Sequence, residues 1–228
     1  MQDKFVMAEG LRLHYVVEGH GPAMILVHGS HKSNTWRTWE HNIRGLAAYH
    51  RVFVPELPGY GQSPRPLGRG LSAGLTYDLG AMILIGLMSA LGLPSAILVG
   101  ASYGGGICLK VAVTRPELLD KLILVDTVTP EVDLDLGVDL GSIRCPTLIV
   151  WGEDDALIPI SVGYSLQRAI AGSELCLIPD SVRASGGISW AGHAPYRFQP
   201  DAFNLAVIQF TRERRPRARA TPERRGSQ

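Results

Sequence analysis

The stretch Ile97-Leu98-Val99-Gly100-Ala101-Ser102-Tyr103-Gly104-Gly105-Gly106 decides the fold of this chain. An apolar run typical of a buried strand leads into Gly-x-Ser-x-Gly, and a helical pattern follows. In this strand–turn–helix context the motif predicts a tight, strained turn with the serine at its apex. Gly100 and Gly104 would let strand and helix pack closely while Ser102 Oγ stays accessible. The alternative is a glycine-rich turn with an ordinary serine, and the motif alone does not decide between the two.

Length and composition indicate one α/β domain. The chain has 228 residues, of which 46% are hydrophobic and 19% charged, as is ordinary for a globular protein with a substantial core. The formal net charge is +1, but residues 212–228 hold seven Arg and two Glu and so carry +5, which leaves −4 for the rest. We expect residues 212–228 to be a disordered tail, with weak contact to an anionic surface as the alternative, and we expect no nucleic-acid binding.

Cysteine usage and the N-terminus predict a cytoplasmic protein. Cys108, Cys145 and Cys176 are far apart, odd in number and without metal-ligand spacing, which favours free thiols in a reducing compartment. The N-terminus shows no signal-peptide pattern. The longest apolar stretch, Leu79 to Leu93, is too short to span a bilayer easily, so we expect a buried helix and no membrane span.

Apolar runs alternate with helical segments, which predicts a mainly parallel sheet with helices on both faces. The first two strands should form an antiparallel pair. We find no internal repeat and no second domain, and therefore expect a single domain over residues 1–211. Expected strands lie at 4–8, 11–18, 23–27, 49–55, 96–99, 121–125, 147–151 and 175–178, and expected helices at 79–91, 103–114, 161–171 and 200–212.

A serine hydroxyl needs a base to take its proton, and the base needs a carboxylate to orient it. The acid candidates Glu153, Asp154 and Asp155 follow a buried strand, and three adjacent carboxylates cannot all point at one imidazole. We expect Glu153 and Asp154 to lie in a solvated loop and Asp155 to be the acid. Asp126, which also ends a strand, is the alternative.

His193 is the candidate base, because it follows the last expected strand and precedes the final helix. The order Ser, Asp, His is the order in which such triads occur in α/β sheets of this kind. Two further histidines lie near the expected site. His28 sits in a tight apolar turn, which favours a structural role, and His31 is a candidate substrate contact.

Acyl transfer also requires donors for the oxyanion, usually two backbone N–H groups. The residue after the nucleophile, Tyr103, would supply one at a helix N-terminus, where the helix dipole helps. Ser30, which follows the strand ending at Val27-His28-Gly29, is best placed to supply the second.

Taken together, these residues resemble the α/β-hydrolase superfamily, in particular its esterase, C–C hydrolase and enol-lactonase branch. The family's Trp-Gly-x-x-Asp-x-x-x-Pro pattern selects Asp155, and its Gly-His-x-Pro pattern selects His193. A serine at the elbow, where epoxide hydrolases and haloalkane dehalogenases carry aspartate, argues against those two classes. The matching blocks are ILVHGS at 25–30, VPELPGYGQSPRP at 54–66, VGASYGG at 99–105, CPTLIVWGEDDALIP at 145–159 and AGHAPYRFQPDAFN at 191–204.

Two segments depart from the family pattern. Residues 127–144 are too few for the multi-helix cap that usually shapes the pocket, so we expect a reduced or absent cap and an open cleft. Residues 181–190 are an insertion just before His193. The insertion either displaces His193 or forms a lid, and Trp190 and Ile188 are its only large apolar groups. We favour the lid, with Trp190 as a substrate contact.

The resemblance implies a cofactor-independent and metal-free serine hydrolase that cleaves a small ester, thioester or lactone. One alternative is a C–C bond hydrolase of a ring-cleavage dienoate, an activity that normally uses cap residues absent here. Another is a catalytically weak hydrolase-like protein that binds a small molecule or partner. The expected partner is a small acyl substrate, and a homodimer is an open alternative to a monomer.

Overall fold

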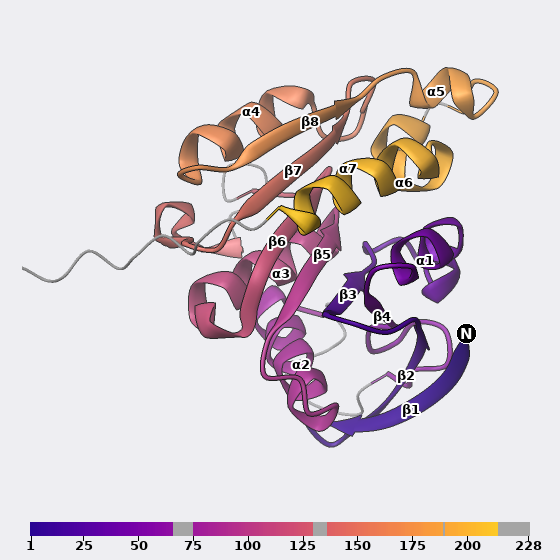
Figure 1. The fold of residues 1–228 in the computed structure, drawn as a ribbon, viewed down its shortest axis with the longest axis vertical. Coiled ribbons are helices and arrows are strands. Elements are labelled where there is room, and N and C mark those ends of the chain that lie inside the picture. The colour runs from indigo at the N-terminus through magenta and orange to yellow at the C-terminus, as the bar shows by residue number, and fades with distance from the viewer. Residues whose placement is uncertain (66–74, 130–135, 189, 214–228) are drawn as a thin grey trace, which may run out of the picture.

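In the computed structural model, the residues described are 1–65, 75–129, 136–188 and 190–213. They form an eight-stranded sheet in the order β1-β2-β4-β3-β5-β6-β7-β8 (Figure 1). The strands are β1 (Gln2–Ala8), β2 (Leu11–Glu18), β3 (Ala23–Val27), β4 (Arg51–Pro55), β5 (Ala96–Ala101), β6 (Leu119–Val125), β7 (Thr147–Gly152) and β8 (Glu174–Ile178). The helices are α1 (Glu40–Ala47), α2 (Tyr77–Ala90), α3 (Tyr103–Thr114), α4 (Ile160–Ala169), α5 (Ser181–Ala184), α6 (Pro195–Phe198) and α7 (Pro200–Arg212).

The sheet is parallel apart from its first strands. β2 pairs antiparallel with both β1 and β4, and every pairing from β4 to β8 through β3, β5, β6 and β7 is parallel. All six residues of β5 are buried, as expected for a central strand covered on both faces. The predicted α/β architecture with an antiparallel start is therefore confirmed.

Helices cover both faces of the sheet and enclose two apolar cores. On one face, α2, α3 and α4 pack over side chains such as Leu98 and Ile149. On the other, α1, α6 and α7 pack over side chains such as Val99 and Val150. Neighbouring residues of a strand thus point into different cores, as the two-residue repeat of a strand requires.

The segment between β6 and β7 is short, and some of its apolar side chains are buried in the core. It contains a 3₁₀ turn at Leu140–Ser142, and the side chains of Leu136 and Ile143 are fully buried in the core beneath α2 and α3. Residues 130–135 of the expected 127–144 segment lie outside the described residues. The part that is described contains no cap helix, in agreement with a reduced cap.

The structure adds a helix to the expected 181–190 segment and moves the start of the expected tail. The 181–190 segment opens with the one-turn helix α5, and its residue 189 is outside the described residues. Helix α7 runs through Arg212, so the tail cannot begin before 213. The guanidinium of Arg212 lies 5.2 Å from the ring centre of Tyr49. Residues 214–228 of the expected tail are not among those described.

No helix in the described part of the chain combines the length and the apolar character needed to cross a bilayer.

Candidate active site

The turn between β5 and α3 places Ser102 at the carboxyl edge of the sheet. Its backbone adopts φ 52° and ψ −121°, a strained conformation for a residue with a side chain. The strain is held by close packing. A Cβ at Gly100 would lie 2.5 Å from the carbonyl oxygen of Gly104, and a Cβ at Gly104 would lie 2.5 Å from those of Val27 and His28. Glycine is therefore required on both sides of the serine.

The imidazole of His193 is hydrogen-bonded to Asp155. His193 Nδ1 lies 2.7 Å from Asp155 Oδ2. The side chain of Asp155 is fully buried and that of His193 is 16% exposed. The other carboxylate oxygen, Asp155 Oδ1, accepts from the backbone N–H groups of Leu157 at 2.8 Å and Ile158 at 3.0 Å. These bonds fix the carboxylate, which in turn leaves Nε2 of His193 as the free nitrogen of the ring.

Backbone contact between two loops brings Asp155 and His193 together. A Cβ at Gly152 would lie 2.0 Å from the carbonyl oxygen of Gly192, and a Cβ at Gly192 would lie 2.3 Å from that of Asp154. Only glycine permits so close an approach. The glycine before His193 is thus a packing requirement, and the 181–190 insertion does not prevent His193 from reaching Asp155.

Asp126, the alternative acid, does not contact His193. Its Oδ1 accepts from the N–H of Gly152 at 2.9 Å, and its buried Oδ2 has no hydrogen-bond partner among the described residues. Burial, and next the negative charge of Asp155, raise the pKa of Asp126 well above its usual range. Asp126 is therefore a buried carboxyl group, bonded to the end of β7, whose ionisation is disfavoured.

Of the two carboxylates expected to be solvated, only Glu153 is exposed. The expectation for Asp154 was wrong. Its Oδ2 accepts from the N–H of Val182, at the start of α5, at 2.6 Å, and its Oδ1 is buried. A charge-assisted bond of this kind ties the 181–190 segment to the loop that holds Asp155.

The loop after β3 is held from behind by His28 and Tyr60. Burial lowers the pKa of His28 to about 4, so the ring is neutral at pH 7. Its Nδ1 donates to the carbonyl of Gly29 at 2.8 Å, and its Nε2 accepts from the N–H of Leu57 at 3.1 Å. The Tyr60 hydroxyl donates to the carbonyl of Ser30 at 2.8 Å. The structural role expected of His28 is borne out by these bonds.

The two expected oxyanion donors lie on different elements. Ser30 lines the pocket on the loop after β3, whereas Tyr103 is the first residue of α3. The Tyr103 ring stacks on Tyr77 with 4.5 Å between ring centres, and its hydroxyl donates to the carbonyl of Leu75. The side chain of Tyr103 therefore packs against Tyr77 and Leu75. The group of Tyr103 expected to bind the oxyanion is its backbone N–H, at the start of α3.

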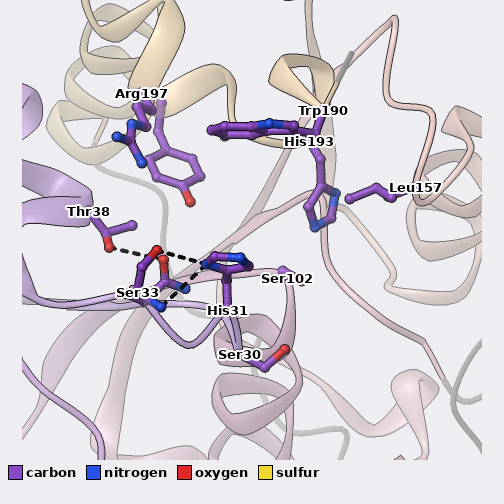
Figure 2. A pocket seen from close by; sticks show the side chains of 13 residues that line it. Ser30, His31, Ser33, Thr38, Ser102, Leu157, Trp190, His193 and Arg197 are labelled. Atoms are coloured by element: carbon purple, nitrogen blue, oxygen red, sulfur yellow. Dashed lines mark hydrogen bonds between the residues drawn. The ribbon is translucent and has the colours of Figure 1, made fainter. Parts of the chain in front are cut away.

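Ser102 and His193 line one pocket of about 620 Å³ (Figure 2). A volume of this size suits a small organic molecule. No hydrogen bond joins Ser102 Oγ to His193 in this structure, and such bonds often tighten only when substrate is bound. Among the described residues, no group of three or more His, Cys, Asp or Glu side chains is arranged to hold a metal ion.

Both predicted substrate contacts line this pocket. His31 is exposed, and its Nδ1 shares hydrogen bonds with the hydroxyl and N–H of Ser33, at 2.8 and 3.3 Å, which leaves Nε2 to face the pocket. Trp190 is 46% exposed and its ring contacts Phe198, with 5.2 Å between ring centres. Ile188, its expected companion, is exposed but does not line the pocket.

Sequence reasoning missed a second set of lining residues. Most of them lie within ten positions after His28 or within one helical turn of His193. Their closeness in sequence to these two motifs could have identified them as pocket residues. Figure 2 shows Thr38 and Arg197 on the same wall. The set comprises Gly29, Ser33, Asn34, Thr38, Leu157, Ala194, Tyr196 and Arg197.

Comparison with known proteins identifies the family of this chain. A sequence model of the family described as "alpha/beta hydrolase fold" matches residues 22–141, more than half of the chain. The chain belongs to the alpha/beta hydrolase fold family. Hydrolysis is the reaction class that this family supports.

Curated relatives include several hydrolases. Epoxide hydrolase 4 of Mus musculus is 34% identical over 127 residues, covering 54% of this chain and 33% of that protein. The 2-hydroxymuconate semialdehyde hydrolase of Pseudomonas sp. (strain CF600) is 32% identical over 135 residues, covering 59% of this chain and 46% of that protein. This chain thus spans about a third to a half of the length of these relatives.

Solved structures share the fold over nearly the whole chain. The meta-cleavage product hydrolase CumD from Pseudomonas fluorescens IP01 aligns with a TM-score of 0.78 at 20% identity, covering 91% of this chain and 97% of that one. The enol-lactonase from Burkholderia xenovorans LB400 aligns with a TM-score of 0.76 at 19% identity, covering 92% of this chain and all of that one.

Proposed function

We propose that this chain is a serine hydrolase that cleaves a small ester, thioester or lactone through an acyl-enzyme. The observation that carries the proposal is the 2.7 Å bond from His193 Nδ1 to Asp155, in the pocket that also holds the strained Ser102. This bond orients the imidazole and leaves Nε2 as the base. The serine at the elbow supports acyl transfer over the aspartate-dependent chemistry of epoxide hydrolases.

In the first half-reaction, Ser102 Oγ attacks the substrate carbonyl while His193 Nε2 takes its proton. The charge that develops on the carbonyl oxygen is stabilised by the backbone N–H groups of Ser30 and Tyr103. His193 then gives its proton to the departing alcohol, thiol or ring oxygen. In the second half-reaction, His193 takes a proton from water as the water oxygen attacks the acyl carbon. His193 then gives that proton to Ser102 Oγ as the bond between Oγ and the acyl carbon breaks, and the carboxylic acid leaves. The ionised Asp155 stabilises the imidazolium in both steps.

A C–C bond hydrolase of a ring-cleavage dienoate is the second candidate. Two relatives favour it: the 2-hydroxymuconate semialdehyde hydrolase and a 2-hydroxy-6-oxononadienedioate/2-hydroxy-6-oxononatrienedioate hydrolase of Burkholderia vietnamiensis, which is 24% identical across 89% of this chain and 91% of that protein. No described residue of the 127–144 segment lines the pocket, which favours the ester reaction over one that normally uses cap residues.

A panel of p-nitrophenyl esters with acyl chains of increasing length, a thioester, a lactone and a dienoate chromophore tests the proposal. We expect turnover of at least one ester, thioester or lactone by the wild type. Ser102→Ala should lose on the order of a millionfold in kcat with the fold unchanged by circular dichroism. An alanine variant that keeps most of the wild-type activity would refute the assignment of Ser102, and turnover of the dienoate alone would select the second candidate.

A further inference from the structure

We infer that the side-chain amide of Asn34 is a third oxyanion donor, beside the backbone N–H groups of Ser30 and Tyr103. The inference rests on the proposed function and adds a side chain that touches the reacting atoms. It arises from the position of Asn34 next to the nucleophile, from the hydrogen bonds that orient its amide, and from the absence of any other partner for the amide nitrogen in the described part of the chain.

Asn34 Nδ2 and Ser102 Cβ both lie close to Gly29, on the side where a side chain would stand. A Cβ built on Gly29 would lie 3.2 Å from Ser102 Cβ and 3.6 Å from Asn34 Nδ2. Both side chains also line the 620 Å³ pocket. Gly29 immediately precedes Ser30, whose N–H is an expected donor, so the amide nitrogen lies at the edge of the place where the oxyanion would form.

A chain of hydrogen bonds sets the direction of the amide. The N–H of Thr35 donates to Thr38 Oγ1 at 3.3 Å, and the Thr38 hydroxyl donates to Asn34 Oδ1 at 3.3 Å. In Figure 2 the dashed line that starts at Thr38 marks this last bond. In this structure the hydroxyl accepts one bond and donates the other, the oxygen of the amide faces Thr38, and the nitrogen lies toward Gly29. Thr38 itself is only 7% exposed and is held firmly.

The backbone on either side restrains the donor further. The N–H of Asn34 donates to the carbonyl of His31 at 2.8 Å, which closes a turn immediately before the 3₁₀ helix at Trp36–Trp39. A donor whose side chain and backbone are both fixed needs little reorganisation when charge develops on the substrate. An amide N–H binds a negative oxygen more strongly than a neutral carbonyl, so its contribution falls mainly on the transition state.

The test uses Asn34→Ala and Asn34→Asp, with Lys32→Ala as the control on the same loop, since Lys32 is exposed and does not line the pocket. Removal of one oxyanion donor costs about 10²–10³ in kcat in a well-studied protease, and with two backbone donors left we expect a loss of about 10- to 100-fold for Asn34→Ala. Asn34→Asp should lose more, because a carboxylate repels the oxyanion. KM for a p-nitrophenyl ester should change little.

A phenylboronic acid, which forms a tetrahedral adduct with an active-site serine, separates a catalytic from a structural role. Its inhibition constant should rise in Asn34→Ala by about the factor lost in kcat, while melting temperatures stay near the wild type. Thr38→Val should show a smaller loss of the same kind, and Thr38→Ser should restore it. Loss of kcat without weaker boronate binding would contradict the inference.

The results also separate this inference from the proposed function. If the wild type hydrolyses esters and both Asn34 variants keep kcat within about twofold, the inference fails and the proposed function stands. If the wild type neither hydrolyses any ester, thioester or lactone nor binds the boronate, both fail.

Discussion

Two adjacent aspartates after β7 have different partners and therefore different roles. Asp155 accepts from His193, whereas Asp154 accepts from the backbone of Val182. Asp155→Asn places an amide against Nδ1, which favours the wrong imidazole tautomer, and we expect a fall of about 10⁴ in kcat as in a comparable triad. Asp154→Asn should leave kcat nearly unchanged and lower the free energy of unfolding by about 1 kcal/mol. Steady-state kinetics and urea unfolding of both variants measure this, and equal losses of kcat would contradict it.

Asp126 predicts a pH dependence of stability. Its pKa is raised in the folded protein, so the folded state holds a proton that the unfolded state releases above about pH 4. Its contribution to stability therefore falls as pH rises from the unfolded pKa towards the raised folded pKa. Asp126→Asn removes the titrating group, so the variant should not show this fall in the free energy of unfolding as pH rises.

Urea unfolding between pH 5 and pH 9 measures the effect of Asp126→Asn. The stability of the variant relative to wild type should increase with pH across this range, while Asp201→Asn, on the exposed side of α7, should give parallel curves. Parallel curves for Asp126→Asn would mean that Asp126 is ionised in the folded protein.

Sequence was a good guide to residues fixed by local motifs and a poor one to residues fixed by tertiary contacts. The Gly-x-Ser-x-Gly turn needs small residues wherever it occurs, so Ser102 and its strained backbone could be predicted. Nothing local distinguishes Asp154 from an ordinary solvated carboxylate, because its partner Val182 is 28 positions away. Asn34 was missed for the same reason, because its side chain is placed beside the pocket by its contacts with Gly29 and Thr38 in the folded chain.

The 181–190 segment forms one wall of the pocket through Trp190. It is tied at its start by Asp154 and at its end by the bond from the N–H of His193 to the Trp190 carbonyl at 3.1 Å. These attachments favour the lid over displacement of His193. Sequence favoured the lid but could not settle the position of His193, because that position depends on backbone contact between Gly152 and Gly192.

Trp190→Ala tests this wall. Because the ring lines the pocket without touching the serine turn, we expect a rise in KM of about tenfold for a long-chain ester, and little change in kcat for an acetate ester. Ile188→Ala is the matched control, an exposed apolar residue of the same segment outside the pocket lining. If both variants raise KM equally, or if Trp190→Ala raises kcat with no change in chain-length preference, the lid is wrong.

The molecule is built on an eight-stranded sheet, and the segment that joins β6 to β7 is short. The alternation of apolar strands and helices made this architecture predictable, since each element carries its own periodicity. Element ends were less predictable: the strand expected at 49–55 begins at Arg51, and the helix expected at 161–171 spans Ile160–Ala169. The end of α7 at Arg212 was expected, and its last turn is held by the rest of the fold. Lys121 Nζ donates to the carbonyls of Phe210 and Thr211 at 2.6 and 3.1 Å.

Two truncations distinguish the last turn of α7 from residues 214–228. Deletion of residues 214–228, a stretch rich in arginine and without large apolar side chains, should change neither melting temperature nor kcat on a neutral ester. Deletion from residue 210 onward also removes the partners of Lys121 and the buried Phe210, and should lower the free energy of unfolding by roughly 3 kcal/mol or more. A large fall in melting temperature on the shorter deletion would show that residues 214–228 pack against the domain.

Labelling by a fluorophosphonate probe tests whether Ser102 is activated by His193 and Asp155. We expect one equivalent of probe per folded wild-type chain, located on the peptide containing Ser102 by mass spectrometry. Ser102→Ala should not be labelled, and Asp155→Asn should be labelled much more slowly than wild type. A Ser102→Ala variant that reacts as fast as wild type would show that Ser102 is not the nucleophile, and a folded wild type that does not react would favour a binding protein.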